Sequence, residues 1–240
     1  NNCLTGSLPA SLGELSVLQQ LAGYDNLLTG SIPSALSAAG QLRTIELNNN
    51  QLQGSLPSTL GVMSLLSSLF LYSNCLTGTI PASFGSLSSI QVLSLGVNFL
   101  SGSLPATLGS LGALTYMSVY QNLLSRSVPS SFMELSSLVA FQLNKNSLTG
   151  NVPTFLCSLG KLTILRIDTN LLTGAVPSCL GSLTVLQYLG LEINSLVGSL
   201  PASVGSLSRL TYLAVNNNAL GGSVPSDITL LSRLVKLGLH

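Results

Sequence analysis

Residues 87–105 read LSSIQVLSLGVNFLSGSLP, and this stretch contains the two spacings that the whole chain repeats. Leu87, Ile90 and Leu93 lie three residues apart, as on one face of a 3₁₀-like coil with about three residues per turn. Leu93 and Leu95 lie two residues apart, as in a short strand with one buried face. The stretch therefore predicts a coil that leads directly into a strand.

This pattern returns at a constant offset of 24 residues along all 240 residues, with no insertion or deletion. The ten prolines all follow the offset, from Pro9 to Pro225. A fixed period of about 20–50 residues indicates a solenoid, in which each unit buries its apolar face against its neighbours. We therefore predict a single domain, residues 1–240, of ten 24-residue repeats.

Strands that recur once per repeat must run in the same direction, so they are expected to form a parallel sheet. An asparagine follows each predicted strand, and its amide can hydrogen-bond backbone groups that the turn leaves unpaired. Stacked at one position, these side chains would form a ladder. The predicted structural asparagines are Asn2, Asn26, Asn50, Asn74, Asn98, Asn122, Asn146, Asn170, Asn194 and Asn218.

The repeat unit, LxxLxxLxLxxNxLxGxIPxxLGxL, resembles the plant-type leucine-rich repeat in all ten units. The resemblance implies an α/β-type repeat solenoid, a right-handed superhelix with a parallel β-sheet on the concave face. It also implies 3₁₀ and loop segments on the convex face, and often a second short strand at the LTGSLP segment. In that family such arrays form the ectodomains of receptor-like kinases and receptor-like proteins, and polygalacturonase inhibitors.

One repeat departs from the motif at its glycine, which is replaced by Arg126. This turn is expected either to tolerate a side chain or to shift slightly. The ends show no paired-cysteine cap. When the last residues, LGLH, are placed before the first residues, NNCLTGSLP, the 24-residue register continues without a gap. We therefore expect the chain to be an internal segment of a longer array, without a cap at either end. End-to-end stacking of identical chains is the less favoured alternative.

The four cysteines are Cys3, Cys75, Cys157 and Cys179. Cys3 and Cys75 share a repeat position three units apart, roughly 14 Å by strand spacing, which is too far for a disulfide. Cys157 and Cys179 lie in adjacent units and could pair, but we favour free thiols that are buried as small hydrophobes. None of the spacings fits a zinc site, and no metal is expected.

Composition excludes several classes of function. The net charge is +1 and only 6% of residues are charged, with basic residues scattered, whereas a nucleic-acid-binding protein needs a basic stripe. No apolar run reaches the roughly 18 residues of a membrane span, so this segment is not expected to contact a membrane. The single histidine is His240, and no catalytic triad or phosphate-binding loop occurs. We therefore predict no enzyme activity, no catalytic residue and no cofactor.

The outward positions of the predicted strands hold all six tyrosines and most of the strand charges. Tyrosine is enriched at interfaces because it offers a large contact area and a polar tip. The alternative is that aromatic side chains merely stack along the sheet. The candidate ligand-binding residues of the concave face are Tyr24, Glu46, Phe70, Tyr72, Tyr116, Tyr120, Arg166, Asp168, Tyr188, Glu192 and Tyr212.

These residues suggest two subsites. Phe70, Tyr72, Tyr116 and Tyr120 form an aromatic subsite. Arg166, Asp168 and Glu192 form a charged subsite, although mutual ion pairing of little energetic value is the more common role of such groups.

The leading functional hypothesis is an extracellular or cell-surface array that recognises a protein, peptide or glycan through its concave sheet. The alternative is a structural protein of a surface layer or filament, assembled through neutral lateral faces and uncapped ends. A minor alternative is ice binding by the Ser and Thr side chains on either side of the motif glycine, such as Thr5 and Ser7.

Overall fold

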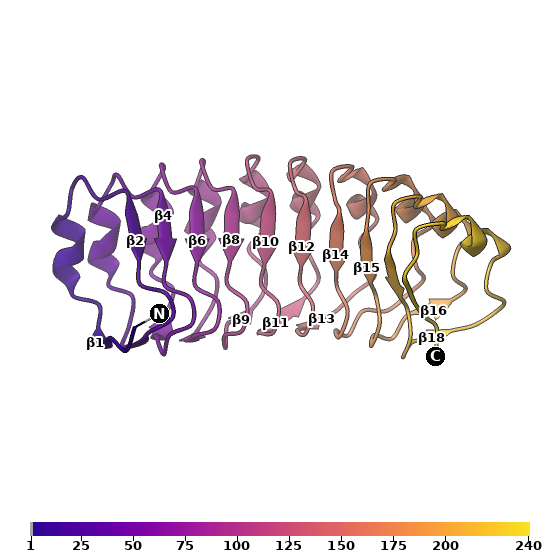
Figure 1. Ribbon diagram of the computed structural model, residues 1–240, viewed down its shortest axis with the longest axis horizontal. Helices are drawn as coiled ribbons and strands as arrows, with labels where there is room; N and C mark the ends of the chain where they lie inside the picture. Colours follow the sequence, from indigo (N-terminus) through magenta and orange to yellow (C-terminus); the bar gives the residue numbers. More distant parts are fainter. Residues whose placement is uncertain (1) are drawn as a thin grey trace.

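The computed structural model describes residues 2–240 and shows a curved solenoid in which each repeat forms one coil (Figure 1). A ten-stranded parallel sheet takes one strand from each repeat, with strands in chain order from β2 to β19. Its strands are β2 (Gln20–Ala22), β4 (Thr44–Glu46), β6 (Ser68–Phe70), β8 (Val92–Ser94), β10 (Tyr116–Ser118), β12 (Ala140–Gln142), β14 (Ile164–Arg166), β15 (Tyr188–Gly190), β17 (Tyr212–Ala214) and β19 (Lys236–Gly238).

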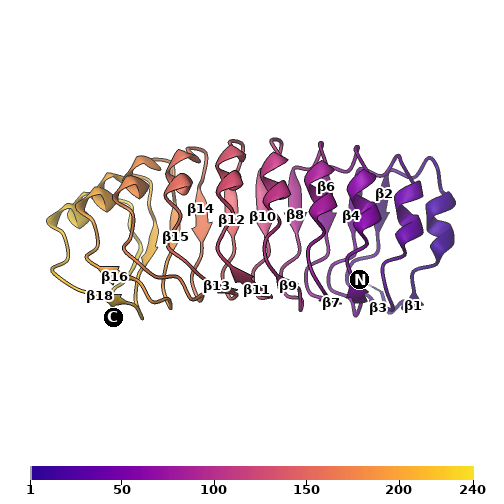
Figure 2. The same ribbon diagram turned by 180° about the vertical axis from the view of Figure 1, so that it is seen from behind.

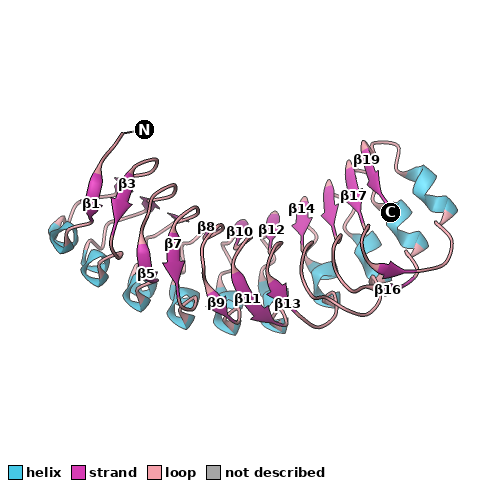
Figure 3. Ribbon diagram, turned by 90° about the horizontal axis from the view of Figure 1, so that it is seen from below, coloured by secondary structure: helices cyan, strands magenta, loops and turns pink. Residues whose placement is uncertain are grey.

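The sheet lines the inner side of the arc, and short 3₁₀ helices line its outer side (Figures 2 and 3). Each helix starts after a proline in extended conformation, because proline fixes φ and its missing N–H would be unpaired there anyway. The helices are η1 (Ala10–Glu14), η2 (Ser34–Ala38), η3 (Ser58–Val62), η4 (Ala82–Ser86), η5 (Ala106–Ser110), η6 (Ser130–Glu134), η7 (Thr154–Ser158), η8 (Ser178–Ser182), η9 (Ala202–Ser206) and η10 (Ser226–Leu230).

A second set of short parallel strands follows the ladder asparagines along the lower edge in Figure 1. They are β1 (Thr5–Ser7), β3 (Leu27–Thr29), β5 (Gln53–Ser55), β7 (Cys75–Thr77), β9 (Ser101–Gly102), β11 (Leu123–Arg126), β13 (Ser147–Leu148), β16 (Val197–Gly198) and β18 (Ala219–Leu220). The architecture confirms the predicted solenoid class.

Arg126 adopts the same left-handed backbone as the glycines it replaces. Its φ is 68°, against 79° for Gly102 and 85° for Gly150 in the neighbouring repeats. The turn therefore keeps its geometry and tolerates the side chain. The backbone of Arg126 is strained, because a residue with a Cβ is disfavoured in the left-handed region.

The ladder asparagines connect consecutive coils through their amides. The Oδ1 atom of Asn98 accepts from the N–H of Leu76 in the preceding coil at 3.0 Å, and its Nδ2 donates to the Leu71 carbonyl there at 3.0 Å. It also donates to the Leu95 carbonyl in its own coil. The full pattern recurs from Asn50 to Asn218. Asn26 accepts from the Leu4 N–H but donates only to the Gly23 and Tyr24 carbonyls of its own coil, and the backbone N–H of Asn2 donates to the Asp25 carbonyl.

The prediction of free thiols at Cys157 and Cys179 is wrong, because the two are joined in a disulfide. Cys157 lies in η7 and Cys179 in η8, and the stacking of the coils brings these positions face to face. Cys3 and Cys75 are free, but both are exposed and do not act as buried hydrophobes. Among residues 2–240 there is no helix with the length and apolarity that crossing a membrane requires.

Candidate ligand-binding surface

The concave face presents three columns of side chains that run across the strands. The first column includes Val92 and Tyr116, which are paired between β8 and β10. The middle column lies two residues further along each strand. It includes Glu46, which is paired with Phe70 between β4 and β6. The third column lies just beyond the strand ends and includes Tyr120. Adjacent members of a column are about 4.8 Å apart, so residues from different repeats can build one site.

A hollow of about 630 Å³ opens on this face over β6 to β14. It brings together all four residues of the predicted aromatic subsite and one residue of the predicted charged subsite. The residues that line it are Phe70, Tyr72, Val92, Ser94, Tyr116, Tyr120, Gln142 and Arg166.

Val92, Ser94 and Gln142 were absent from the candidates drawn from the sequence. All three occupy the first or middle column between predicted members of the hollow. Their side chains are small or uncharged, and such residue types do not by themselves indicate a binding surface in a sequence. Their positions in the two columns could nevertheless have identified them.

The ring of Tyr120 rests on Gly96 of the preceding coil. A Cβ at position 96 would overlap the Cδ1 and Cε1 atoms of that ring, so the missing side chain creates the space. Burial raises the pKa of Tyr120, and the nearby phenols of Tyr116 and Tyr72 raise it further. Three tyrosine side chains thus gather at the hollow.

The C-terminal part of the concave face holds a different arrangement, a stack of aromatic rings capped by cations. Tyr188 and Tyr212 are stacked with ring centroids 3.9 Å apart and an interplanar angle of 8°. The Arg166 guanidinium lies 5.1 Å from the Tyr188 ring, and the Lys236 ammonium lies 4.8 Å from the Tyr212 ring. Both outer faces of the tyrosine pair are therefore occupied within the protein.

The side chains of the predicted charged subsite bond to partners within the protein. Arg166 Nε donates to Asp168 Oδ1 at 3.3 Å, and Tyr212 donates to Glu192 Oε1 at 3.2 Å. Asp168 is only 3% exposed, so it holds Arg166 in position and does not offer a contact surface. Burial raises the pKa of the Glu192 carboxyl, and the neighbouring Asp168 adds to this rise.

Two further predicted residues, Tyr24 and Glu46, lie outside both the hollow and the C-terminal tyrosine stack with its charged neighbours. Tyr24 stands at the N-terminal end of the face and is 44% exposed. Glu46 accepts a hydrogen bond from Gln20 Nε2 at 3.0 Å. The aromatic subsite with Arg166 is therefore the part of the prediction that the structure assembles into one site.

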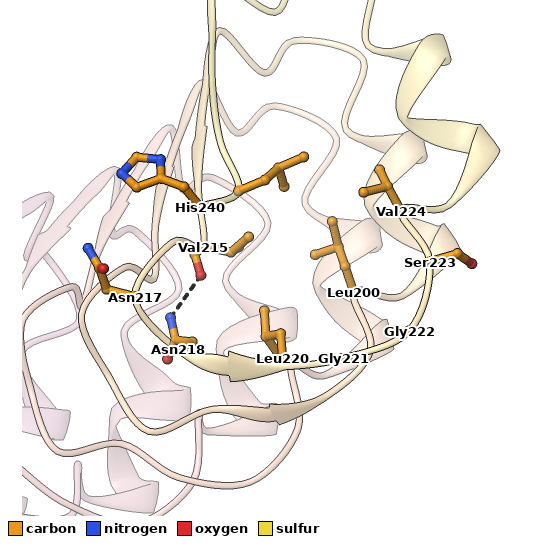
Figure 4. A pocket seen from close by; sticks show the side chains of 11 residues that line it. Leu200, Val215, Asn217, Asn218, Leu220, Gly221, Gly222, Ser223, Val224 and His240 are labelled. Atoms are coloured by element: carbon orange, nitrogen blue, oxygen red, sulfur yellow. Dashed lines mark hydrogen bonds between the residues drawn. The ribbon is translucent and has the colours of Figure 1, made fainter.

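A second hollow lies at the C-terminal end of the solenoid (Figure 4). Leu200, Leu220 and Val224 point into it, and the ladder residue Asn218 borders it and donates to the Val215 carbonyl at 3.0 Å. Its lining combines the core residues Leu200 and Val215 with exposed residues such as Val224 and Leu239, and it holds no group of aromatic rings. No group of three or more His, Cys, Asp or Glu side chains in residues 2–240 could hold a metal ion.

The repeated coils, the concave parallel sheet and the asparagine ladder define a leucine-rich-repeat solenoid. The family model described as Leucine Rich Repeat matches residues 41–63 and 65–87. The chain is therefore a leucine-rich-repeat protein, and its repeats are similar to those of plant receptor ectodomains. No curated protein matches the chain in sequence.

Several solved structures share this fold. A plant peptide hormone receptor, RGFR1, in complex with RGF2 is 33% identical, with a TM-score of 0.96 over 97% of this chain and 37% of that chain. The ectodomain of GASSHO1/SCHENGEN3 from Arabidopsis thaliana, in complex with CASPARIAN STRIP INTEGRITY FACTOR 2, is 34% identical, with a TM-score of 0.86 over 98% and 31%. The chain thus spans less than half the length of these receptor chains.

A plant ice-binding protein is also similar, at 28% identity and a TM-score of 0.82. The match covers 93% of this chain and 72% of that chain. Solved structures with this fold therefore include both receptor ectodomains and an ice-binding protein.

Proposed function

We propose that this chain is a binding segment of a receptor-like protein and captures a peptide or an extended protein segment in its concave hollow, without enzymatic chemistry. The observation that carries this proposal is the open group of aromatic side chains over β6 to β14, beside Arg166. Core packing does not require large aromatic side chains on the outward face of a sheet, whereas binding surfaces are enriched in them.

Two further observations support the proposal. The similar receptor structures were solved in complex with RGF2 and with CASPARIAN STRIP INTEGRITY FACTOR 2. The Cys157–Cys179 disulfide suits an oxidising compartment, where such bonds persist. We therefore propose that the protein acts outside the cell or at its surface.

The test is to pan random peptides displayed on phage against the immobilised chain. Peptides recovered with the wild-type chain should fail to bind the Tyr72→Ala, Tyr116→Ala, Tyr120→Ala triple variant. The matched control is Tyr24→Ala, which removes an exposed tyrosine of the same sheet outside the hollow. Thermal unfolding should show similar stability for both variants. Recovered peptides that bind the triple variant equally well would place binding elsewhere and refute the proposal.

A second candidate function rests on the lateral face. Hydroxyl side chains flank the motif glycine on the second set of strands, and we call this set of residues the hydroxyl array. It comprises Thr5, Ser7, Thr29, Ser31, Ser55, Thr77, Thr79, Ser101, Ser103, Ser125, Ser127, Thr149, Thr173, Ser199 and Ser223.

The array is regular because each hydroxyl residue after a motif glycine stacks on the glycine of the next coil. A Cβ on Gly30 would approach the Ser7 Cβ at 2.9 Å, and one on Gly78 would approach the Ser55 Cβ at 3.3 Å. Exposed hydroxyls thus recur once per strand spacing of about 4.8 Å. Arg126 is the charged residue that interrupts the motif. Asn151 and Ala175 interrupt the column of hydroxyls after the glycine, which resumes at Ser199 and Ser223.

We propose ice as the alternative ligand of this array, a role supported by the similarity to the plant ice-binding protein. Thr79→Lys should abolish thermal hysteresis and inhibition of ice recrystallisation, because a long charged side chain disrupts the ordered water. Arg126→Gly should strengthen both activities. The Tyr72→Ala, Tyr116→Ala variant serves as the control and should retain them. Absence of both activities in the wild-type chain would eliminate this candidate.

A further inference from the structure

The aromatic rings of the hollow have unpaired faces. In residues 2–240, the rings that pack as pairs are Phe132 with Phe141 in the core and Tyr188 with Tyr212. None of these four residues lines the hollow. The concave face therefore contains one tyrosine pair whose outer faces are covered by cations and one aromatic group in which no ring is stacked on another.

Tyr120 is the ring best prepared to stack with a ligand. One side of its ring rests on Gly96, where a Cβ would overlap it. The same side chain lines the hollow, so the ring is also accessible from the open space. A ring supported from behind loses little conformational entropy when a second ring packs on it, which favours binding.

Arg166 provides a fixed cationic group at the end of the same hollow. Its Nε is bound to Asp168 at 3.3 Å and its guanidinium lies over Tyr188, so the side chain is held in place from two sides. Arginine carries further N–H donors on its terminal nitrogens, and these suit a carboxylate. The hollow thus pairs a stacking surface with an anion-binding group.

The separation of these two groups sets the spacing of a ligand. Tyr120 and Arg166 belong to coils that are two apart, which corresponds to about 10 Å across the sheet. A peptide in the polyproline II conformation rises about 3.1 Å per residue with three residues per turn, so side chains three positions apart lie on the same side of it, about 9 Å apart. A peptide lying across the strands can therefore reach both groups with side chains three positions apart.

We propose that the hollow recognises a peptide with an aromatic side chain stacked on Tyr120 and an acidic side chain three residues away bound to Arg166. This inference rests on the proposed peptide-binding function and specifies the chemistry of its ligand. Gly96 is a positioning residue in this scheme, because it acts only through the ring of Tyr120.

The test examines the sequences of the peptides recovered from the phage library. Peptides that depend on the hollow should be enriched in an aromatic and an acidic residue three positions apart. Arg166→Gln should remove the preference for the acidic residue and leave the aromatic preference in place.

A recovered peptide that contains tryptophan gives a direct readout. The chain has no tryptophan, so the ligand's fluorescence can be followed without background. Gly96→Ala should weaken binding by roughly three- to tenfold, the loss expected for one aromatic stacking contact. The fold should survive, because the atoms that the new methyl group overlaps belong to the movable ring of Tyr120, while the Tyr120 carbonyl oxygen lies 3.2 Å from it. The control is Gly112→Ala, where nothing lies within 4 Å of the added Cβ.

The outcomes separate this inference from the proposed function. Hollow-dependent peptides without the aromatic–acidic spacing, or unchanged affinity in Gly96→Ala, would overturn the inference and leave peptide binding intact. Failure to recover any peptide that depends on the hollow would overturn both.

Discussion

Cys157 and Cys179 are bridged at the two facing positions through which a glycine and a serine touch in other coils. Gly61 in η3 faces Ser83 in η4 so closely that a Cβ would overlap the serine backbone. Glycine at this position lets adjacent 3₁₀ helices approach. Cys157 has a Cβ at this position, and η7 and η8 accordingly lie less close together than η3 and η4. The disulfide spans the resulting gap.

Loss of this bridge should destabilise the C-terminal coils. The bond closes a loop with a sequence separation of 22 residues, for which chain entropy gives about 3 kcal/mol. We expect Cys157→Ser with Cys179→Ser to lose roughly this free energy of unfolding in urea. Cys157→Gly with Cys179→Ser should recover part of the loss, because it restores the glycine–serine contact of the other coils. Equal stability of the two double variants would contradict this account of the bridge.

The asparagine ladder should contribute more to the free energy of unfolding inside the array than at its N-terminal end. Asn98→Ala leaves the buried Leu76 N–H without its partner and removes one of the two donors to the Leu71 carbonyl, which keeps Asn74, at an expected cost of about 2 kcal/mol. Asn26 bonds a more exposed N–H, that of Leu4, so Asn26→Ala should cost about 1 kcal/mol. Urea unfolding of the two variants measures the difference in their free energies of unfolding. Equal losses would mean that burial does not determine how much each ladder asparagine stabilises the fold.

The fold followed from the sequence because every coil repeats the same local rules. The ten prolines at a constant offset and the change of spacing from three to two were sufficient for the sheet and the 3₁₀ helices. Residue positions on the concave face also followed, since the side-chain period of a strand is two.

Side-chain direction did not follow from the sequence. Asp168 shares a column with Tyr120, yet Asp168 is buried beside Arg166 while Tyr120 turns over Gly96. The neighbours in the next coils decide these orientations. The Cys157–Cys179 bridge was missed for a related reason, because its signal was an offset of 22, the offset of the glycine–serine contact.

Non-glycine residues in the left-handed region offer a way to stabilise the protein. Ile193 has a φ of 54° in the turn before the ladder asparagine, and a β-branched side chain is strained there. We expect Ile193→Asn to stabilise the fold by about 1 kcal/mol, since asparagine tolerates this conformation and Ile193 is about half exposed. The midpoint of urea unfolding measures the change.

Asn217 supplies the reciprocal control for this substitution. It occupies the equivalent turn of the next repeat with the same φ of 54°. Asn217→Ile should therefore destabilise the fold by about the amount that Ile193→Asn gains. If both substitutions shift the midpoint in the same direction, backbone strain is not the cause.

Glu192 should make stability depend on pH. Its carboxyl is half-buried, and burial followed by the charge of Asp168 raises its pKa above the ordinary value of 4.5. The hydrogen bond from Tyr212 and the positive charge of Arg166 lower the pKa of Glu192 and so oppose this rise. The other titratable groups of this cluster are Tyr188, beside Arg166, and Lys236, beside Tyr212. The folded state therefore binds the Glu192 proton more tightly than the unfolded state does.

The sign of the effect follows from this linkage. The stabilisation from the proton is complete below pH 4.5 and is lost as the pH rises through the higher folded-state pKa of Glu192. Glu192→Gln mimics the protonated carboxyl, so the variant should exceed the wild type in melting temperature at neutral pH. The difference should vanish as the pH falls toward 4.5, where the wild type is protonated too. Because other carboxyls titrate equally in both proteins, a difference that stays constant with pH would show that burial of Glu192 is not coupled to folding.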